Sequence, residues 1–345
     1  MMSEPVKTAL TGYGYAGKTF HAPLIRAARG LALSTVVSSR PDEVHVDIPG
    51  VRVLDFESAL ADPAIELVVI ATPNDLHAPQ AIEALKAGKH VVIDKPFAIT
   101  TAEAETVLAA AKTANRLATV FHNRRWDGDF LTAKSLIDSG KLGEVSLFIS
   151  RFDRFRPYLR NRWREQSLPG SGLWYDLGAH LVDQALCLFG SPDVVALDLA
   201  QQREGSVVDD YFHATLFYGP HRVRLQASTL TPAPGPRFEV HGRRGSWVKY
   251  GLDTQEDDLK AGKHVGGEGW GLDRDGLFTP VADIDPLPPV AQPTLPGRYE
   301  AFYEGMAAAI RGNGPLPVAP QEALNVMRLL DLARESAETG HVIRL

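Results

Sequence analysis

Two short segments carry side chains that can take up and release protons. Lys95 comes directly after the apolar run 90–93, and Asp176 and His180 stand four residues apart in a later segment. Partial desolvation at the end of a buried strand brings the pKa of a lysine toward the range useful for proton transfer. A spacing of four places two side chains on one face of a helix, where a carboxylate orients an imidazole. We therefore predict that Lys95, Asp176 and His180 are catalytic, in general acid–base chemistry.

Each of these signals also has a plainer interpretation. Lys95 could pair with Asp94 in a structural turn, and Asp176 with His180 could form an ordinary pair on a helix surface. Leu, Trp and Ala flank this second pair, which favours a partly buried helix, where a carboxylate and an imidazole need a reason to be present. No metal site is predicted, because no third ligand stands at a suitable spacing.

A glycine-rich segment near the start of the chain predicts dinucleotide binding. Gly12, Gly14 and Gly17 follow an apolar strand expected at 6–11 and precede a helix expected at 17–28. In this G-x-G-x-x-G pattern the first glycine permits a tight turn and the second lets backbone amides approach a pyrophosphate. The third lets the helix lie close to the strand. We predict cofactor contacts at Gly12, Gly14, Tyr15 and Gly17.

The end of the second expected strand, 32–38, indicates which dinucleotide is bound. An NAD-preferring fold usually has Asp or Glu here to hold the ribose 2′-hydroxyl, whereas a 2′-phosphate calls for hydroxyls and arginine. Ser38, Ser39 and Arg40 match the phosphate. We therefore predict NADP. NAD is the alternative, if this segment is a solvated turn and Asp42 holds the ribose.

The loops after two later strands, 66–71 and 90–93, are expected to pass the ribose and the nicotinamide. His77 has two interpretations, a direct cofactor contact or a helix-start residue that only covers the cofactor. The predicted cofactor residues of these loops are Thr72, Pro73, Asn74, His77, Asp94, Lys95 and Pro96.

These loops belong to an alternation of strands and helices that predicts a Rossmann-type, doubly wound parallel sheet. Nearly continuous apolar runs fit strands that are buried on both faces of such a sheet. We expect its strands at 6–11, 32–38, 66–71, 90–93 and 117–121, and its helices at 17–28, 76–87 and 101–114.

The pattern changes after about residue 122, where β-branched and aromatic segments separated by Gly and Pro predict an α+β domain with a large, mostly antiparallel, open sheet. Residues 251–297 are rich in Gly, Pro and Asp and predict a long surface excursion. We expect a dinucleotide-binding domain at 1–122 and a substrate-binding and oligomerisation domain at 123–345. The second has strands at 144–153, 193–200, 211–218, 221–229, 237–241 and 246–250, and helices at 127–139, 174–189, 298–311 and 319–339.

Composition narrows the possible functions. Of 345 residues, 44% are hydrophobic and 23% charged, which is ordinary for a globular protein of two domains. The net charge of −6 argues against binding to nucleic acid or to an anionic membrane. Cys187 is the single cysteine, which excludes an intrachain disulfide or a CxxC motif. With no signal-peptide pattern and no apolar run near ~18 residues, we expect a cytoplasmic protein.

An arginine-rich segment, 151–164, gives weaker candidates for substrate contact, namely Asp153, Arg156 and Trp163. Arginines here could hydrogen-bond a polyol or a sugar acid. They could equally pair with carboxylates at a subunit interface. A nucleic-acid patch is disfavoured by the negative overall charge.

The chain resembles the glucose–fructose oxidoreductase / inositol dehydrogenase / MocA (Gfo/Idh/MocA) family along essentially its whole length. The motifs that carry this resemblance are GYGYAG at 12–17, TPNDLH at 72–77, DKP at 94–96 and D-x-x-x-H at 176–180. The phrases GKTFHAPLI, FHNRRWDGDF and RFDRFRP resemble its branch of NADP-dependent scyllo-inositol dehydrogenases. The family usually has Glu where this chain has Asp94, which keeps the charge but shortens its reach.

The resemblance implies catalytic roles at Lys95, Asp176 and His180, and substrate contacts at the same residues. It also implies that Asn123, Arg124 and Trp126 line the nicotinamide or substrate side, although a domain linker is an equal alternative there. Homodimers or homotetramers built on the open sheet are expected, with a small-molecule substrate as the other partner.

The motifs together predict an NADP-dependent oxidoreductase that acts on a secondary alcohol of a cyclic polyol or sugar, with scyllo-inositol as the leading candidate. His180 is the first choice for the base and Lys95 for the residue that stabilises the reacting oxygen, and the two roles could be reversed. The alternatives are a redox glycosidase that recycles NAD and a non-catalytic NADP-binding regulator. The catalytic trio argues against the regulator.

Overall fold

The computed structural model describes residues 4–160 and 163–345, and for residue 163 only the backbone. The chain divides into two compact units that are not continuous in sequence. The first unit comprises the chain up to Trp126 together with Gln255–Trp270 and Arg298–Met327. The second unit comprises Asp127–Thr254, Gly271–Gly297 and Arg328–Leu345.

Within the described part of the first unit, six strands form a parallel sheet in the order β3-β2-β1-β4-β5-β6. The predicted doubly wound sheet is therefore confirmed. Its order reverses next to β1, and ligands of such sheets bind beyond the carboxyl ends of the strands at this point. The strands are β1 (Val6–Thr11), β2 (Leu31–Val37), β3 (Arg52–Leu54), β4 (Leu67–Ile70), β5 (His90–Ile93) and β6 (Ala118–Val120).

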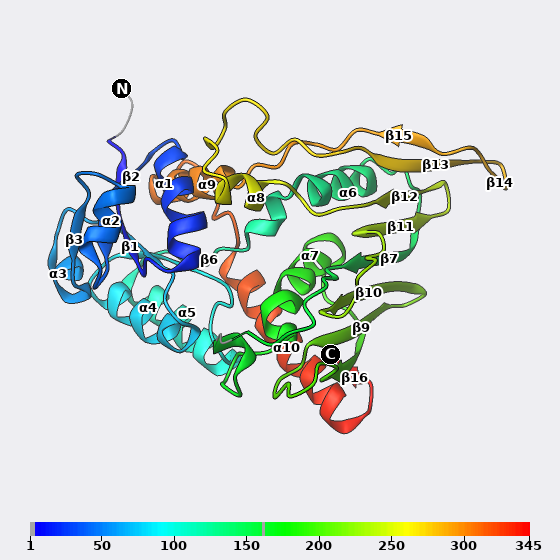
Figure 1. Ribbon diagram of the computed structural model, residues 1–345, viewed down its shortest axis with the longest axis horizontal. Helices are drawn as coiled ribbons and strands as arrows, with labels where there is room; N and C mark the ends of the chain where they lie inside the picture. The colour runs from blue at the N-terminus through cyan, green and yellow to red at the C-terminus, as the bar shows by residue number, and fades with distance from the viewer. Residues whose placement is uncertain (1–3, 161–162) are drawn as a thin grey trace. The chain divides into compact units, whose positions relative to one another are not determined.

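Helices lie on both faces of this sheet. Figure 1 shows α4 and α5 side by side on one face and α1 with α9 on the other. The helix expected at 17–28 begins as a π-helical turn, Gly17–His21, and continues as α1. The helices are α1 (Ala22–Ala27), α2 (Pro41–Asp47), α3 (Phe56–Ala61), α4 (His77–Lys86), α5 (Thr101–Ala114), α8 (Gln255–Lys260) and α9 (Glu300–Ile310).

Within the described part of the second unit, ten strands form one sheet in the order β14-β13-β12-β11-β7-β10-β9-β8-β16, with β15 paired to β13. Neighbouring strands run antiparallel except β7 and β10, which confirms the predicted mostly antiparallel sheet. The strands are β7 (Val145–Arg151), β8 (Val194–Ala200), β9 (Tyr211–Tyr218), β10 (His221–Ser228), β11 (Phe238–Gly242), β12 (Gly245–Lys249), β13 (Gly276–Ala282), β14 (Asp285–Pro286), β15 (Val290–Gln292) and β16 (Ile343–Arg344).

Three helices lie along one face of this sheet in Figure 1. They are α6 (Gly128–Asp138), α7 (Ala179–Phe189) and the later part of α10 (Pro320–Thr339), because the division between the units falls within α10. The indole of Trp174 donates a hydrogen bond to the Leu330 carbonyl at 3.2 Å and so attaches α10 to the turn before α7. Among the described residues, no helix covers the opposite face.

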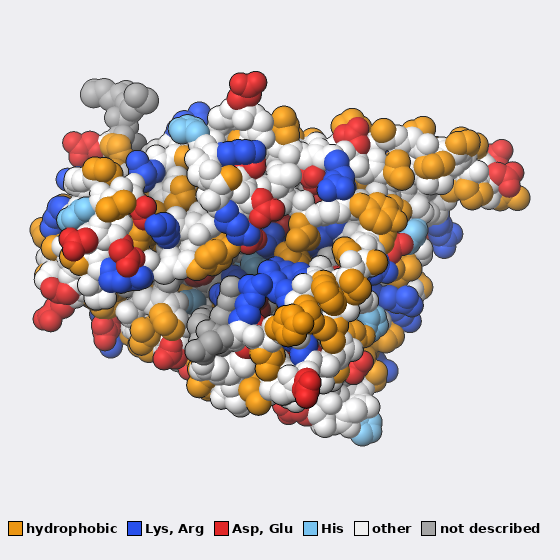
Figure 2. All heavy atoms as spheres, viewed as in Figure 1, with side chains coloured by type: hydrophobic (Ala, Val, Ile, Leu, Met, Phe, Trp, Pro, Cys, Tyr) orange, Lys and Arg blue, Asp and Glu red, His pale blue; other side chains and the backbone are white. Residues whose placement is uncertain are grey.

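The expectation of a surface excursion at 251–297 was wrong in part, because α8 and three strands lie within it. β13 and β15 extend the sheet as an arm. Because the edge of this arm is exposed, polar and apolar residues alternate little along its sequence. In Figure 2 hydrophobic side chains lie along this arm, where Ile284, Leu287 and Val290 are exposed.

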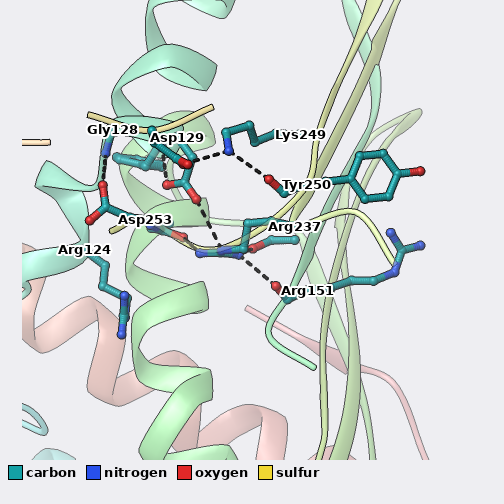
Figure 3. Close-up of polar contacts among 12 residues, drawn as sticks. Arg124, Gly128, Asp129, Arg151, Arg237, Lys249, Tyr250 and Asp253 are labelled. Carbon is teal, nitrogen blue, oxygen red and sulfur yellow. Dashed lines mark hydrogen bonds and ion pairs between the residues drawn. The ribbon is translucent and has the colours of Figure 1, made fainter. Parts of the chain in front are cut away.

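A buried group of charges fixes the start of α6 against the sheet (Figure 3). Oδ2 of Asp129 lies 3.8 Å from Nε of Arg237, and both side chains are almost fully buried. Nζ of Lys249 pairs with Asp273 at 2.7 Å. Burial raises the pKa of Asp129, while the charges of Arg237 and Lys249 oppose this rise. Each buried charge is thus balanced by an opposite one.

Candidate functional site

The glycine loop after β1 has the shape that a dinucleotide requires. Gly12 has a φ of +92°, and a β-carbon there would be 2.6 Å from the Ala71 carbonyl oxygen. A β-carbon at Gly17 would be 2.1 Å from the Gly12 carbonyl oxygen, whereas one at Gly14 would meet no atom within 4 Å. The first and third glycines are thus required by packing, and the open space at the second fits a pyrophosphate. The residues present fit a dinucleotide cofactor.

The hydroxyl of Tyr15 connects this loop to the start of α8. It donates to Oε1 of Glu256 at 3.1 Å, and Oε2 of the same carboxylate accepts from Arg124 at 2.9 Å. Lys260 adds a third partner at 2.9 Å. Burial alone would raise the pKa of Glu256, but Arg124 and Lys260 lower it to about 2. Two predicted cofactor residues, Tyr15 and Arg124, therefore meet through a carboxylate that the sequence did not reveal.

Arg40 is tied to the glycine loop from the end of β2. Its guanidinium donates to the Tyr13 carbonyl at 3.2 Å and pairs with Glu43 at 2.9 Å. The Arg40 backbone N–H donates to the Ser38 hydroxyl at 3.1 Å. Arg40 is thereby held beside the loop with its side chain about half exposed. Ser39 is exposed, as is Asp42 in the first turn of α2.

His77 joins the loop after β4 to the loop after β5. Its Nδ1 lies 2.8 Å from the Pro96 carbonyl oxygen and its Nε2 lies 2.9 Å from the Thr72 carbonyl oxygen. Burial lowers the pKa of His77, against the opposing charge of Asp94. These contacts assign His77 to holding the two loops together, and contact with the cofactor stays a prediction, as it does for Pro73 and the buried Asn74.

Lys95 stands in a cis Lys95–Pro96 dipeptide at the carboxyl end of β5. Its backbone N–H donates to Oδ1 of Asp94 at 2.9 Å. Nε2 of His21 lies 3.6 Å from the same oxygen, and Nδ1 of His21 lies 2.5 Å from the hydroxyl of Tyr303. Burial would raise the pKa of Asp94, yet His21 and then Lys95 bring it down to about 2. Sequence reasoning missed His21 and Tyr303.

Asp176 and His180 lie in one helical segment of the second unit, which starts with a π-helical turn, Trp174–Gly178, and continues as α7. Asp176 is therefore in the wider turn, and His180 is in the first turn of α7. Oδ1 of Asp176 lies 3.5 Å from Nε of Arg164, and His180 is buried. Asp209 accepts the Trp174 N–H at 2.6 Å and fixes the start of the segment.

The weaker candidates are dispersed over several contacts. Asp153 accepts from Gln226 at 3.5 Å, and burial raises its pKa. The carbonyl of Arg156 accepts from the buried Arg203 at 3.4 Å, and the side chain of Trp163 lies outside the described residues. In the first unit, the turn Asn123–Trp126 buries Asn123 and Arg124 and packs Trp126 edge-on against Phe302 at 5.5 Å.

Among the described residues, no helix is both long and apolar enough to cross a membrane. In the same part of the chain, no three side chains of His, Cys, Asp or Glu are grouped as metal ligands would be.

Comparison with known proteins gives matches over nearly the whole chain. Residues 6–122 match the model described as "Oxidoreductase family, NAD-binding Rossmann fold", and residues 134–345 match "Oxidoreductase family, C-terminal alpha/beta domain". The uncharacterized oxidoreductase YdgJ of Escherichia coli is 50% identical over 339 residues, which cover 98% of each chain. The scyllo-inositol 2-dehydrogenase (NADP(+)) IolW of Bacillus subtilis is 39% identical over 99% of this chain and 96% of its own. The structure of YPO2259 from Yersinia pestis superposes with a TM-score of 0.96 at 48% identity, covering 100% of this chain and 98% of the other.

Proposed function

Because the chain belongs to the Gfo/Idh/MocA family of oxidoreductases and is an NAD(P)-dependent dehydrogenase, we propose that it uses NADP to oxidise a secondary alcohol of a cyclic polyol or sugar. The observation that carries this proposal is the anchored Lys95 at the carboxyl end of β5, in the same sheet whose β1 leads into the open glycine loop. The similarity to IolW supports scyllo-inositol as the first substrate to test.

In the proposed reaction the alcohol becomes a ketone. When bound, the nicotinamide supplies the acceptor for the hydride that leaves the carbinol carbon with its electron pair. His180, oriented by Asp176, takes the hydroxyl proton on a ring nitrogen. The Lys95 ammonium donates a hydrogen bond to the same oxygen and stabilises the negative charge that develops there. Ketone reduction uses the same residues in reverse, and the alternative assignment exchanges the roles of Lys95 and His180.

Alanine substitutions test this mechanism. Lys95→Ala and His180→Ala should each lower kcat by at least ~100-fold, the scale expected for a positioned acid or base. NADP affinity should change little in the His180 variant, because the histidine is assigned to the substrate. Lys134→Ala is the control, since Lys134 forms a surface pair with Asp138 at 2.6 Å and is not among the predicted site residues. Near-normal turnover in both catalytic variants would contradict the mechanism.

The preference for NADP rests on Arg40. Its hydrogen bond to the Tyr13 carbonyl keeps the guanidinium beside the glycine loop, and this supports its proposed contact with a 2′-phosphate. Arg40→Ala should weaken NADP binding by roughly 10-fold or more, the loss expected for a hydrogen bond between charged groups, and should leave NAD binding nearly unchanged. Equal effects on both cofactors would favour NAD instead, with Asp42 on the ribose.

Substrate identity is tested by a panel of inositols and aldoses with NADP and with NAD, read by the absorbance of the reduced cofactor. Net NADPH formation with scyllo-inositol is the expected result. Copurifying NAD without net reduction would favour a redox glycosidase, and tight NADP binding without any turnover would favour a regulator.

A homo-oligomer is proposed to form through the face of the ten-stranded sheet that no described helix covers. Several outward-facing side chains of its central strands are only partly exposed, among them Arg151 and Glu239, which form an ion pair. A dimer or tetramer in light scattering is the expected result. A monomer at micromolar concentration would contradict the proposal.

A further inference from the structure

We infer that His21 and Tyr303 are positioning residues for Lys95, acting through the carboxylate of Asp94, and this role rests on the proposed catalytic function of Lys95. The three residues come from separate parts of the first unit. His21 ends the π-helical turn after the glycine loop, Asp94 follows β5, and Tyr303 lies on α9, 282 residues after His21.

These groups form a row of polar contacts in an apolar setting, in which Nε2 of His21 faces Asp94 at ion-pair distance. The Tyr303 hydroxyl lies 2.5 Å from Nδ1 of His21, and Nε2 lies 3.6 Å from Oδ1 of Asp94. That oxygen also accepts the Lys95 N–H at 2.9 Å. His21 and Tyr303 are fully buried, and the ring of Phe121 packs on both, at 4.7 and 5.5 Å between ring centres.

The carboxylate of Asp94 favours one direction for these contacts. An ionised Asp94 can only accept, so it favours the tautomer that carries a proton on Nε2 of His21. In that tautomer Nδ1 is an acceptor, and the hydroxyl of Tyr303 donates to it. Burial raises the pKa of Tyr303 well above its usual value, which keeps this proton on the phenol. The other titratable groups that face Asp94 are His77 and Lys95.

The arrangement has a consequence for the ammonium. Oδ1 of Asp94 contacts both Nε2 of His21 and the backbone N–H of Lys95. If the Tyr303 hydroxyl is lost, His21 is free to change tautomer and Asp94 loses its fixed donor. The loop that carries Lys95 can then shift, and a displacement of about 1 Å can lower a rate by ~100-fold.

Tyr303→Phe tests this with the removal of a single oxygen. We expect kcat to fall at least ~10-fold while the KM values for NADP and substrate change less than about twofold, since ground-state binding is untouched. Tyr218→Phe is the matched control, because its hydroxyl donates to the Gly190 carbonyl at 3.0 Å and has no contact with the chain of residues above. It should keep the kcat of the original protein. A kcat for Tyr303→Phe equal to that of the control would overturn the inference.

A double-mutant cycle separates positioning from general loosening. In an Asp94→Asn background the Tyr303→Phe change should lower kcat by less than about twofold, because its route to Lys95 is already lost. An undiminished effect in that background would overturn the inference. Lys95→Ala in the same assay tests the premise that Lys95 is catalytic. Near-normal turnover of this variant would refute the proposed function. An inactive Lys95→Ala variant together with a fully active Tyr303→Phe variant would refute only the positioning role.

NMR of protein labelled with ¹⁵N-histidine provides a readout independent of activity, with His21→Gln to assign the signal. We expect Nε2 of His21 to be protonated and Nδ1 to be an unprotonated acceptor whose shift changes in Tyr303→Phe. A protonated Nδ1, or a signal that does not respond to Tyr303→Phe, would overturn the inference.

Discussion

Alanine substitutions in the glycine loop should cause two different kinds of damage. A β-carbon at Gly17 would be 2.1 Å from the Gly12 carbonyl oxygen, far inside the contact distance of carbon and oxygen. A β-carbon at Gly14 would have no neighbour within 4 Å. We therefore expect Gly17→Ala to destabilise the fold and Gly14→Ala to leave it intact. The second variant should instead bind the dinucleotide weakly, because its methyl group enters the space assigned to the pyrophosphate.

The magnitudes follow from the geometry. Forcing a methyl group into a packed site costs roughly 1–3 kcal/mol, and the clash at Gly17 is with backbone, which cannot move aside. Gly12→Ala adds to its own clash about 1–2 kcal/mol for a left-handed backbone. Gly50 has a similar φ of +79° and open space around it, so Gly50→Ala measures the backbone contribution alone. For Gly14→Ala we expect NADPH affinity to fall at least ~10-fold, which is about 1.4 kcal/mol.

Two assays separate these effects. Thermal unfolding without ligand reports stability, and the first transition is used because two units need not unfold together. Fluorescence titration with NADPH reports affinity. The reasoning is refuted if Gly14→Ala binds NADPH as the original protein does, or if Gly17→Ala is as stable as Gly14→Ala.

Two further predictions concern buried charges. Burial and then Arg116 lower the pKa of His90 from 6.5 to about 4. As the pH drops through this range the unfolded chain takes up the proton first, so the stability of the folded protein falls. His90→Gln should therefore flatten the dependence of Tm on pH between these values, and an unchanged slope would contradict this. Asp129→Asn should lower the free energy of unfolding by roughly 3–5 kcal/mol, and with it Tm, because Arg237 loses its buried counter-charge. The control is the surface change Asp138→Asn, which should cost less than about 1 kcal/mol. Equal losses in the two variants would contradict the role of Asp129 as a buried counter-charge.

The sequence predicted those elements whose burial leaves a continuous or alternating pattern. The bounds expected for 6–11, 90–93 and 101–114 are the observed ones. The sequence did not reveal β3, because a three-residue edge strand with no fully buried residue shows no periodicity. It also missed the arm at 276–292, where glycine, proline and an exposed edge obscure the alternation.

The residues of the candidate site also differ in whether the sequence could predict them. The glycine loop and the Asp94–Lys95 pair could be predicted because their chemistry lies within a few consecutive residues. Glu256 and Tyr303 could not, since their partners lie 241 and 282 residues away and nothing in their own segments marks them. His21 had a weak signal, as a histidine between Phe20 and Ala22 near the start of the helix. The family resemblance, carried by ordered motifs, is confirmed by both domain models.

The later segments are structurally necessary to the dinucleotide-binding unit. Phe121 and His21 would be exposed if the chain ended at residue 126, because α9 covers them with Phe302 and Tyr303. Arg311, just after α9, makes two hydrogen bonds to Glu66 at 2.6 and 2.9 Å and so fastens the helix to the segment that enters β4. The hydroxyl that contacts Nδ1 of His21 therefore comes from α9. The six strands of the sheet end at Val120, but the unit around them is complete only with segments that follow residue 254.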